Sequence, residues 1–278
     1  MNTNSKEYFL HHKFGNNNYQ IYVNDILVSS SVAGNGIPAP YEINQYLFLK
    51  GAQKLRINVQ APIKLKKYNI SQKDILDFKG KTLITLLENE AFSNIKNILE
   101  ATFYDIKQST PVIEQEWEFE AELPIYCDNL ENSEDLSKWD EKELEKVVVN
   151  RFTELRDLLN DGNGNQVYTE VKKATESIFI AEYMDNSEQQ EFSTNITDFF
   201  TSHKGTMLPI ENYHLRLMGN GKAVALEYAT GKLQGLGILS SEDIEENTRN
   251  INYFILHKPK SSNKFEVFRY NSSYTAIE

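Results

Sequence analysis

The hydrophobic period of the chain changes near residue 130, and no other feature constrains the fold as strongly. Before that point, short runs such as residues 19–30 and 53–62 carry apolar side chains at roughly every second position. After it, the apolar side chains recur at steps of three and four, at Leu144, Val148, Phe152, Leu155 and Leu159. A period of about two is typical of strands and one of about 3.6 of helices. The sequence therefore predicts two cores, a β-sandwich over residues 1–128 and an α+β domain over 129–278.

The second domain is expected to contain about three helices followed by an antiparallel sheet. Helical spacing covers residues 137–160 and 166–185, and a third helix opens at residue 187. Beyond it, two alternating runs flank Gly219-Asn220-Gly221, which is a strong hairpin signal. Helices followed by such a meander are typical of an α+β fold.

The most regular strand of the chain is "EQEWEFEAELP", residues 114–124. Its alternation places Trp117 and Phe119 on the face toward a core. On the opposite face it places five carboxylates in a row, at Glu114, Glu116, Glu118, Glu120 and Glu122. We call this row the acidic strip.

Two interpretations of the acidic strip stay open at the level of sequence. It is either a solvated sheet face whose charge discourages edge pairing, or a docking surface for a basic protein. A pair of its glutamates acting as general acid and base is disfavoured, because nothing apolar on that face would separate their pKa values.

The charge balance limits the partners. Forty acidic residues against 29 basic ones give a net charge of −11, which disfavours nucleic acid as a partner because phosphate contacts need clustered Lys and Arg. The nearest basic patch, "KLKKY" at 64–68, is interpreted as a solvated linker, with a partner contact as the alternative. The chain has no run of about 18 apolar residues and no apolar leader segment, so we expect no membrane insertion and a cytoplasmic location.

Residues 159–168, "LNDGNGNQVY", imitate the beginning of a calcium loop, with oxygen-bearing side chains at Asp161, Asn163 and Asn165. Such a loop needs Gly at its sixth position and a bidentate Glu at its twelfth, where this chain has Gln166 and Lys172. We therefore predict helix caps here, with Asn165 capping the second helix, and no metal.

The sequence contains no recognisable catalytic motif. The single cysteine, Cys127, has no recognisable histidine partner, and no histidine pair, nucleophile elbow or phosphate loop is present. The sequence favours a non-enzymatic protein without a cofactor, while an enzyme stays open. If the second domain forms an open cone, its lining would include Tyr213, His214, Tyr228 and Tyr253.

Part of the first domain resembles the galactose-binding-like jelly rolls. The resemblance covers about 40 residues and is carried by Asn24, Ile43, Asn44, Leu47, Lys50, Gly51, Leu55 and Val59, although Asp25 and Gln45 depart from the usual Gly and Pro. It implies a sandwich fold, and it suggests carbohydrate binding as one possible role. The element order of the second domain is similar to that of NTF2-like domains, and the whole chain resembles uncharacterised bacterial accessory and immunity-type proteins.

From these observations we expect a non-catalytic interaction module that binds a basic protein through the acidic strip. The first alternative is a small-ligand binder or enzyme that uses a cone in the second domain. The second is carbohydrate binding by the sandwich, although Trp117 is committed to the core face. The sequence does not fix the oligomeric state.

Overall fold

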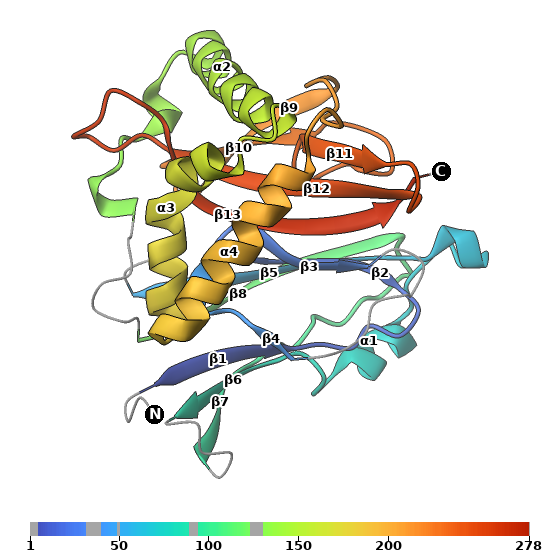
Figure 1. The fold of residues 1–278 in the computed structure, drawn as a ribbon. Helices are drawn as coiled ribbons and strands as arrows, with labels where there is room; N and C mark the ends of the chain where they lie inside the picture. The colour runs from blue at the N-terminus through green and yellow to red at the C-terminus, as the bar shows by residue number, and fades with distance from the viewer. Residues whose placement is uncertain (1–4, 32–39, 49–50, 89–93, 123–129, 278) are drawn as a thin grey trace. The chain divides into compact units, whose positions relative to one another are not determined.

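The computed structural model describes residues 5–31, 40–48, 51–88, 94–122 and 130–277. Its α-carbon contacts group the chain into two units, residues 1–127 with 181–183, and residues 128–180 with 184–278. The described residues form four α-helices and three antiparallel sheets, so the predicted α+β class is confirmed (Figure 1).

Unit 1 is built from two four-stranded antiparallel sheets, which give it a sandwich-like character. One sheet has the strand order β4-β1-β6-β7 and the other has the order β3-β2-β5-β8. The strands are β1 (Lys6–His11), β2 (Asn18–Val23), β3 (Ile26–Ser31), β4 (Tyr41–Glu42), β5 (Ala52–Gln60), β6 (Leu83–Glu88), β7 (Ile95–Glu100) and β8 (Val112–Glu120).

Residue alternation decides which face of each strand is buried in unit 1. In β5, the odd-numbered residues from Gln53 to Val59 are buried, while the even-numbered residues between them are partly exposed. β8 follows the same rule, with Ile113 and Phe119 buried and its glutamates exposed. Burial of one face of each sheet fixes the register, because a slip by one residue would turn the apolar set outward.

A tight turn at Asn24 and Asp25 joins β2 to β3. Both residues have positive φ, 49° and 70°, as the mirror-image turns of hairpins require. The buried Asn24 side chain donates one hydrogen bond of 2.7 Å to the carbonyl oxygen of Tyr46 and another of 2.7 Å to Oε1 of Gln53. Its own oxygen accepts from the amide of Lys54 at 2.9 Å.

Asn44 forms a second buried node of unit 1. It lies in the 3₁₀ turn η1 (Asn44–Tyr46), accepts from the amide of Tyr8 at 2.8 Å and donates to the carbonyl oxygens of Lys6 and Ala181. The last bond explains why residues 181–183 belong to unit 1. Of the positions that carry the jelly-roll resemblance, Asn24, Asn44 and the apolar residues are all buried, so packing and turn geometry account for them. Lys50 lies outside the described residues.

Two short helices follow β5. They are the 3₁₀ turn η2 (Ile63–Leu65) and α1 (Gln72–Phe78), which the sequence did not predict. α1 begins with a capping box in which Ser71 and Asp74 satisfy each other's backbone amides. Ile75 and Phe78 anchor the helix in the core, which leaves Leu76 outside.

Unit 2 begins with two 3₁₀ turns and three long helices. These are η4 (Leu130–Asn132), η5 (Leu136–Lys138), α2 (Glu141–Asn160), α3 (Gly164–Ala181) and α4 (Asn186–Ser202). Asp140 caps α2 through the amides of Lys142 and Glu143, and Asp185 forms a capping box with Glu188 at the start of α4. The helix positions agree with the predicted periodicity.

The sheet of unit 2 is organised around its long strand β12 (Thr248–His257). Its other strands are β9 (Tyr213–Met218), β10 (Ala223–Tyr228), β11 (Leu239–Asp243) and β13 (Glu266–Ala276). β13 follows one side of β12 along its length, while β11 pairs with the first half of the other side and β10 with its end. The predicted hairpin turn joins β9 to β10, with positive φ at Gly219, Asn220 and Gly221.

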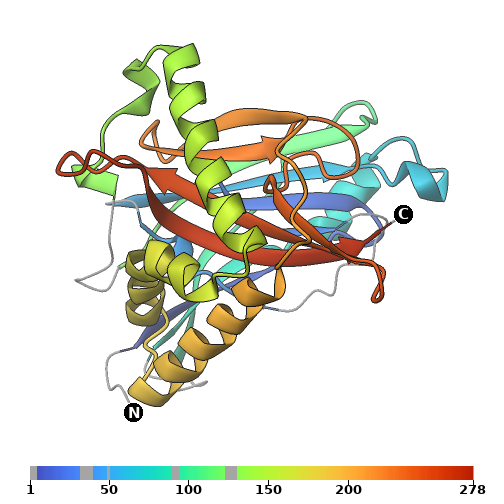
Figure 2. The ribbon, with the colours of Figure 1, turned by 45° about the horizontal axis from the view of Figure 1, so that its top comes forward.

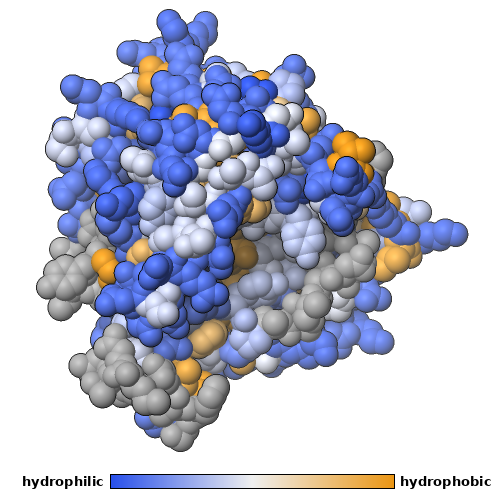
Figure 3. Space-filling view, in the orientation of Figure 1, coloured by the Kyte–Doolittle hydropathy of each residue, from blue (hydrophilic) through white to orange (hydrophobic). Residues whose placement is uncertain are grey.

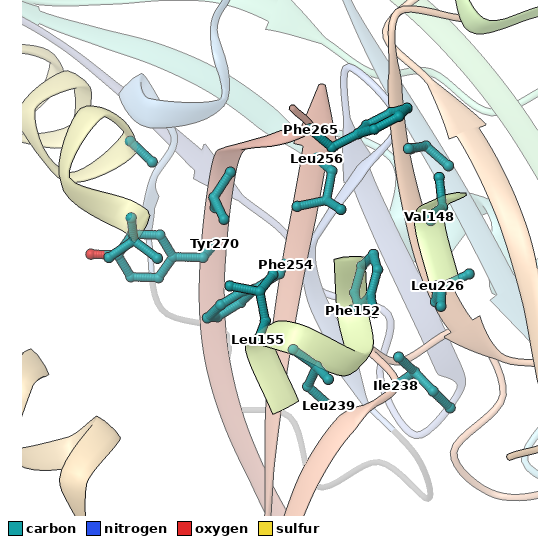
Figure 4. Packing of buried hydrophobic residues seen from close by; sticks show 14 of the residues in the cluster. Val148, Phe152, Leu155, Leu226, Ile238, Leu239, Phe254, Leu256, Phe265 and Tyr270 are labelled. Carbon is teal, nitrogen blue, oxygen red and sulfur yellow. The ribbon is translucent and has the colours of Figure 1, made fainter. Parts of the chain in front are cut away.

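The three helices cover one face of this sheet, and a single apolar cluster fills the space between them (Figures 2 and 4). Phe152 and Leu155 of α2 contribute to this cluster, as do Leu226 of β10 and Phe254 of β12. All four side chains are at most 1% exposed. The space between the helices and this face of the sheet is therefore occupied by packed side chains.

Candidate functional site

The acidic strip lies on an outermost strand of its sheet. In the order β3-β2-β5-β8, strand β8 has only β5 as a neighbour. Its four glutamates, Glu114, Glu116, Glu118 and Glu120, are all exposed. Glu122 lies two residues beyond the end of the strand, and its exposed carboxylate forms an ion pair with Lys6. The structure thus places the five predicted residues together along one edge of unit 1.

Half of the strip within β8 is neutralised by cations of β5. Arg56 lies 3.4 Å from Glu114, which also accepts a 3.1 Å hydrogen bond from Asn58. Lys54 lies 3.8 Å from Glu116. Such half-exposed pairs contribute only about 0–1 kcal/mol each, so they add little to stability. The alternation of "KLRIN" could have placed Lys54 and Arg56 on the exposed face of their strand. The sequence did not show that this strand lies beside β8.

Glu118 and Glu120 differ from the others. Neither carboxylate forms an ion pair with any residue that the structure describes. Both border an open hollow of about 480 Å³, lined also by Ala52 of β5, Asn97 and Ile98 of β7, and Phe119 of β8. β7 is itself the outermost strand of the other sheet. The hollow therefore lies between two sheet edges. Its lining combines apolar side chains with two carboxylates that form no ion pair with a described residue.

The four residues predicted to line a cone do not lie together. Tyr213 and Tyr228 are direct partners across the β9–β10 pair and pack against the helix-covered core, with Tyr228 hydrogen-bonded to Oγ of Ser240 at 2.6 Å. His214 is paired instead with Glu227 in the same hairpin. Because neighbouring residues of a strand face opposite sides, His214 lies on the other face of the sheet. Tyr253 lies there too, since its hydroxyl donates to Glu227.

Glu227 is the centre of a polar cluster that the sequence analysis did not identify. Its carboxylate is 3% exposed and accepts from Arg216 Nη1 at 2.7 Å and from Tyr253, while His214 Nε2 lies 3.4 Å away. A buried carboxylate surrounded in this way is satisfied by its neighbours. The hairpin register could have predicted the Glu227–His214 pair, but not the approach of Tyr253 from β12.

Two further histidines have serine partners. His203 Nδ1 lies 3.0 Å from Ser241 Oγ, and its Nε2 lies 3.0 Å from the side-chain nitrogen Nδ2 of Asn252. Burial lowers the pKa of His203 to about 4, against a smaller opposing effect of Asn252. His203 and Ser241 are each 1% exposed, so no substrate can reach them and they serve as core polar groups. His257 and Ser133 form a similar buried pair at 2.8 Å.

The calcium-like loop consists of helix ends. Gly162, with φ of 70°, closes α2 by donating to the carbonyl oxygen of Leu159 at 3.0 Å. Asn163 rather than the predicted Asn165 caps α3, because its side chain accepts from the amide of Gln166 at 3.2 Å. In the described parts of the chain, no three His, Cys, Asp or Glu side chains are arranged to hold a metal ion. Cys127 lies outside the described residues.

Trp117 is engaged in unit 1 rather than offered as a flat platform. Its indole nitrogen donates to the carbonyl oxygen of Thr102 at 3.3 Å, and Phe103 packs edge-on against its ring at 5.0 Å. None of the helices within the described ranges has the length and apolarity needed to cross a bilayer. No protein-family profile, curated protein or solved structure matches the chain.

Proposed function

We propose that the protein is a non-catalytic interaction module that binds a basic segment of a partner protein at the acidic strip. One observation carries the proposal: Glu118 and Glu120 are exposed, have no counter-cation among the described residues and border a hollow that is lined in part by apolar side chains. Uncompensated charge beside apolar surface supports recognition of a complementary partner, since the charge selects and orients it and the apolar contact adds affinity.

The outermost strands β7 and β8 also suit an extended basic segment as a partner. Outermost strands present unpaired backbone groups that an added strand can satisfy. An extended segment shows alternate side chains to one face, so Lys or Arg at every second position would match Glu118 and Glu120. The setting we propose is that of a bacterial accessory or immunity protein, which rests on the resemblance of the whole chain.

A synthetic six-residue peptide of alternating Lys and Val tests the proposal. Binding of the labelled peptide to the full chain is measured by fluorescence anisotropy, and the variant Glu118→Lys/Glu120→Lys is expected to bind it at least about tenfold more weakly. The matched control is Glu191→Lys/Glu245→Lys, which changes the net charge equally at two exposed positions of unit 2. Equal affinity of the two variants would mean that general charge, and not the strip, attracts the peptide.

A further inference from the structure

A second unusual surface lies at the other end of β8. We call residues 62–69 and the exposed side of α1 the basic knob. It carries four large apolar side chains in water, Ile63 at 64% exposure, Leu65 at 51%, Tyr68 at 61% and Leu76 at 59%. The knob, residues 62–69 with α1, holds four lysines against two aspartates, although the whole chain has a charge of −11. The basic knob is therefore a locally basic surface that also exposes apolar side chains.

The basic knob is held firmly in place. The amide of Ala61 donates to the carbonyl oxygen of Pro111 at 2.9 Å, and Ile70 and Thr110 exchange two backbone hydrogen bonds of 2.7 and 3.1 Å. Lys67 is bound to Asn17 and Asp74, while Lys64, Lys66 and Lys73 are exposed. A segment tied at both ends presents its apolar side chains in a fixed arrangement, which lowers the entropy lost on binding.

Exposed apolar groups gathered at one place indicate a contact surface. The segment from η2 to α1, at the right in Figure 1, coincides with a region of Figure 3 where hydrophobic atoms adjoin hydrophilic ones. Lys73 and Leu76 are three residues apart on α1 and so share one side of it. A partner that complements this surface carries negative charge and has apolar side chains for Ile63, Leu65 and Leu76 to contact.

The acidic strip of the same chain has both properties. The hollow beside Glu118 and Glu120 is lined by Ile98 and Phe119. Ile95, on the same strand β7 as Ile98, is another apolar side chain, and it is 52% exposed. The basic knob adjoins residues 110–111, immediately before β8, and the hollow lies at the end of β8. Eight residues of strand separate Val112 from Glu120, or about 26 Å at a rise of about 3.3 Å per residue. The two surfaces therefore cannot meet within one molecule, but they can meet between two.

We propose that the basic knob of one copy docks into the hollow beside Glu118 and Glu120 of a second copy, so that the protein associates head to tail. This inference rests on the proposed function, since it names a second copy as the bearer of the basic segment. A contact between two different surfaces leaves one knob and one hollow free in each dimer. Such association therefore closes into a ring or continues as an open chain.

The net charge of −11 opposes association, while the contact itself favours it. At about 0.15 M ionic strength the Debye length is about 8 Å, so distant like charges are screened more than groups in contact. The lysines of the knob and the two glutamates meet at contact distance in the complex. Association should therefore occur at moderate salt and weaken as the salt concentration rises further.

Sedimentation velocity of the full chain tests the proposal. At about 0.1 M salt the average mass is expected to rise above the monomer's 32.1 kDa with protein concentration. Two variants should each remain monomeric, the knob variant Ile63→Asp/Leu65→Asp and the strip variant Glu118→Lys/Glu120→Lys. Ile244→Asp, at a 73% exposed apolar position of unit 2, is the matched control and should associate like the unaltered protein. Circular dichroism of each variant confirms that it is folded.

Mixing the two monomeric variants gives the decisive measurement. The knob variant keeps an intact hollow and the strip variant keeps an intact knob, so an equimolar mixture should form a dimer and nothing larger. A contact between two knobs would not be restored by mixing. A mixture that stays monomeric, or an unaltered protein that is monomeric at every concentration, would overturn the inference.

The outcomes separate this inference from the proposed function. If the unaltered protein is monomeric yet binds the Lys–Val peptide through the strip, the proposed function stands and the self-association falls. A further experiment measures whether the protein cosediments with vesicles that contain phosphatidylserine. Cosedimentation that depends on Ile63 and Leu65, with no dimer in the mixture, would assign the knob to an anionic lipid surface and contradict head-to-tail assembly.

Discussion

Glu227 of unit 2 and the pair Glu118 and Glu120 of unit 1 show two opposite uses of a carboxylate. Unit 2 encloses Glu227 with Arg216, His214 and Tyr253, so that its carboxylate is 3% exposed. Unit 1 keeps Glu118 and Glu120 in water without a counter-cation among the described residues. A buried charge must be satisfied for the chain to fold, whereas an exposed charge is free to serve binding. The carboxylates available for binding are therefore those that contribute least to stability.

The largest effect is expected from Glu227. Glu227→Leu leaves Arg216, only 15% exposed, without this carboxylate, and breaking a buried pair costs about 3–5 kcal/mol. Glu116→Leu is the matched change in unit 1, where Lys54 is partly exposed, and should cost no more than about 1 kcal/mol. Urea unfolding of both variants measures the difference. Similar losses would break the contrast between the two units.

A smaller, pH-dependent effect is expected from Glu42. Burial, followed by the charges of Glu182 and Glu7, raises the pKa of Glu42 to about 7 in the folded protein. Since this pKa lies above the value of the unfolded chain, the folded state is favoured at low pH and loses stability as pH rises toward 7. Glu42→Gln should therefore stabilise the protein by about 1–2 kcal/mol at about pH 8, after allowance for screening, and hardly at all at about pH 4.

Asp74→Asn is the control of opposite sign for Glu42. Burial raises the pKa of Asp74, but hydrogen bonds from Lys67 and Ser71 outweigh it and lower the pKa overall. Stability from Asp74 is therefore present at neutral pH and lost as pH falls through its lowered pKa. At about pH 8 the urea midpoints of the two variants should move in opposite directions, upward for Glu42→Gln and downward for Asp74→Asn. A parallel shift would show that the sign assigned to one of these carboxyls is wrong.

The smallest effect on stability is expected for the candidate site itself. Glu118→Lys/Glu120→Lys changes two exposed side chains and should alter the free energy of unfolding by less than about 0.5 kcal/mol. The same variant is expected to lose peptide binding and self-association, so its effects on folding and on binding diverge. A Tm that falls as far as that of Glu227→Leu would show that the strip is structural.

Part of the candidate site was accessible from sequence because it depends on local geometry. Alternation alone placed Glu114 to Glu122 on one face, and the Asn24-Asp25 and Gly219 to Gly221 turns followed from residues that tolerate positive φ. The division of the strip into paired and unpaired glutamates did not follow, because it depends on β5 lying beside β8. The four proposed cone residues were separated for a similar reason, since adjacent strand positions face opposite sides of a sheet.

Local sequence sets the periods of the elements, the turns between them and the side of each strand that is apolar. These features depend on residues within a few positions of one another. Tertiary contacts are needed to bring β7 and β8 to one hollow, to enclose Glu227 and to hold Ile63 and Leu65 exposed on a segment that is hydrogen-bonded at both ends. Each of these depends on strand order and register across distant parts of the chain, and long-range contacts set them rather than local preference.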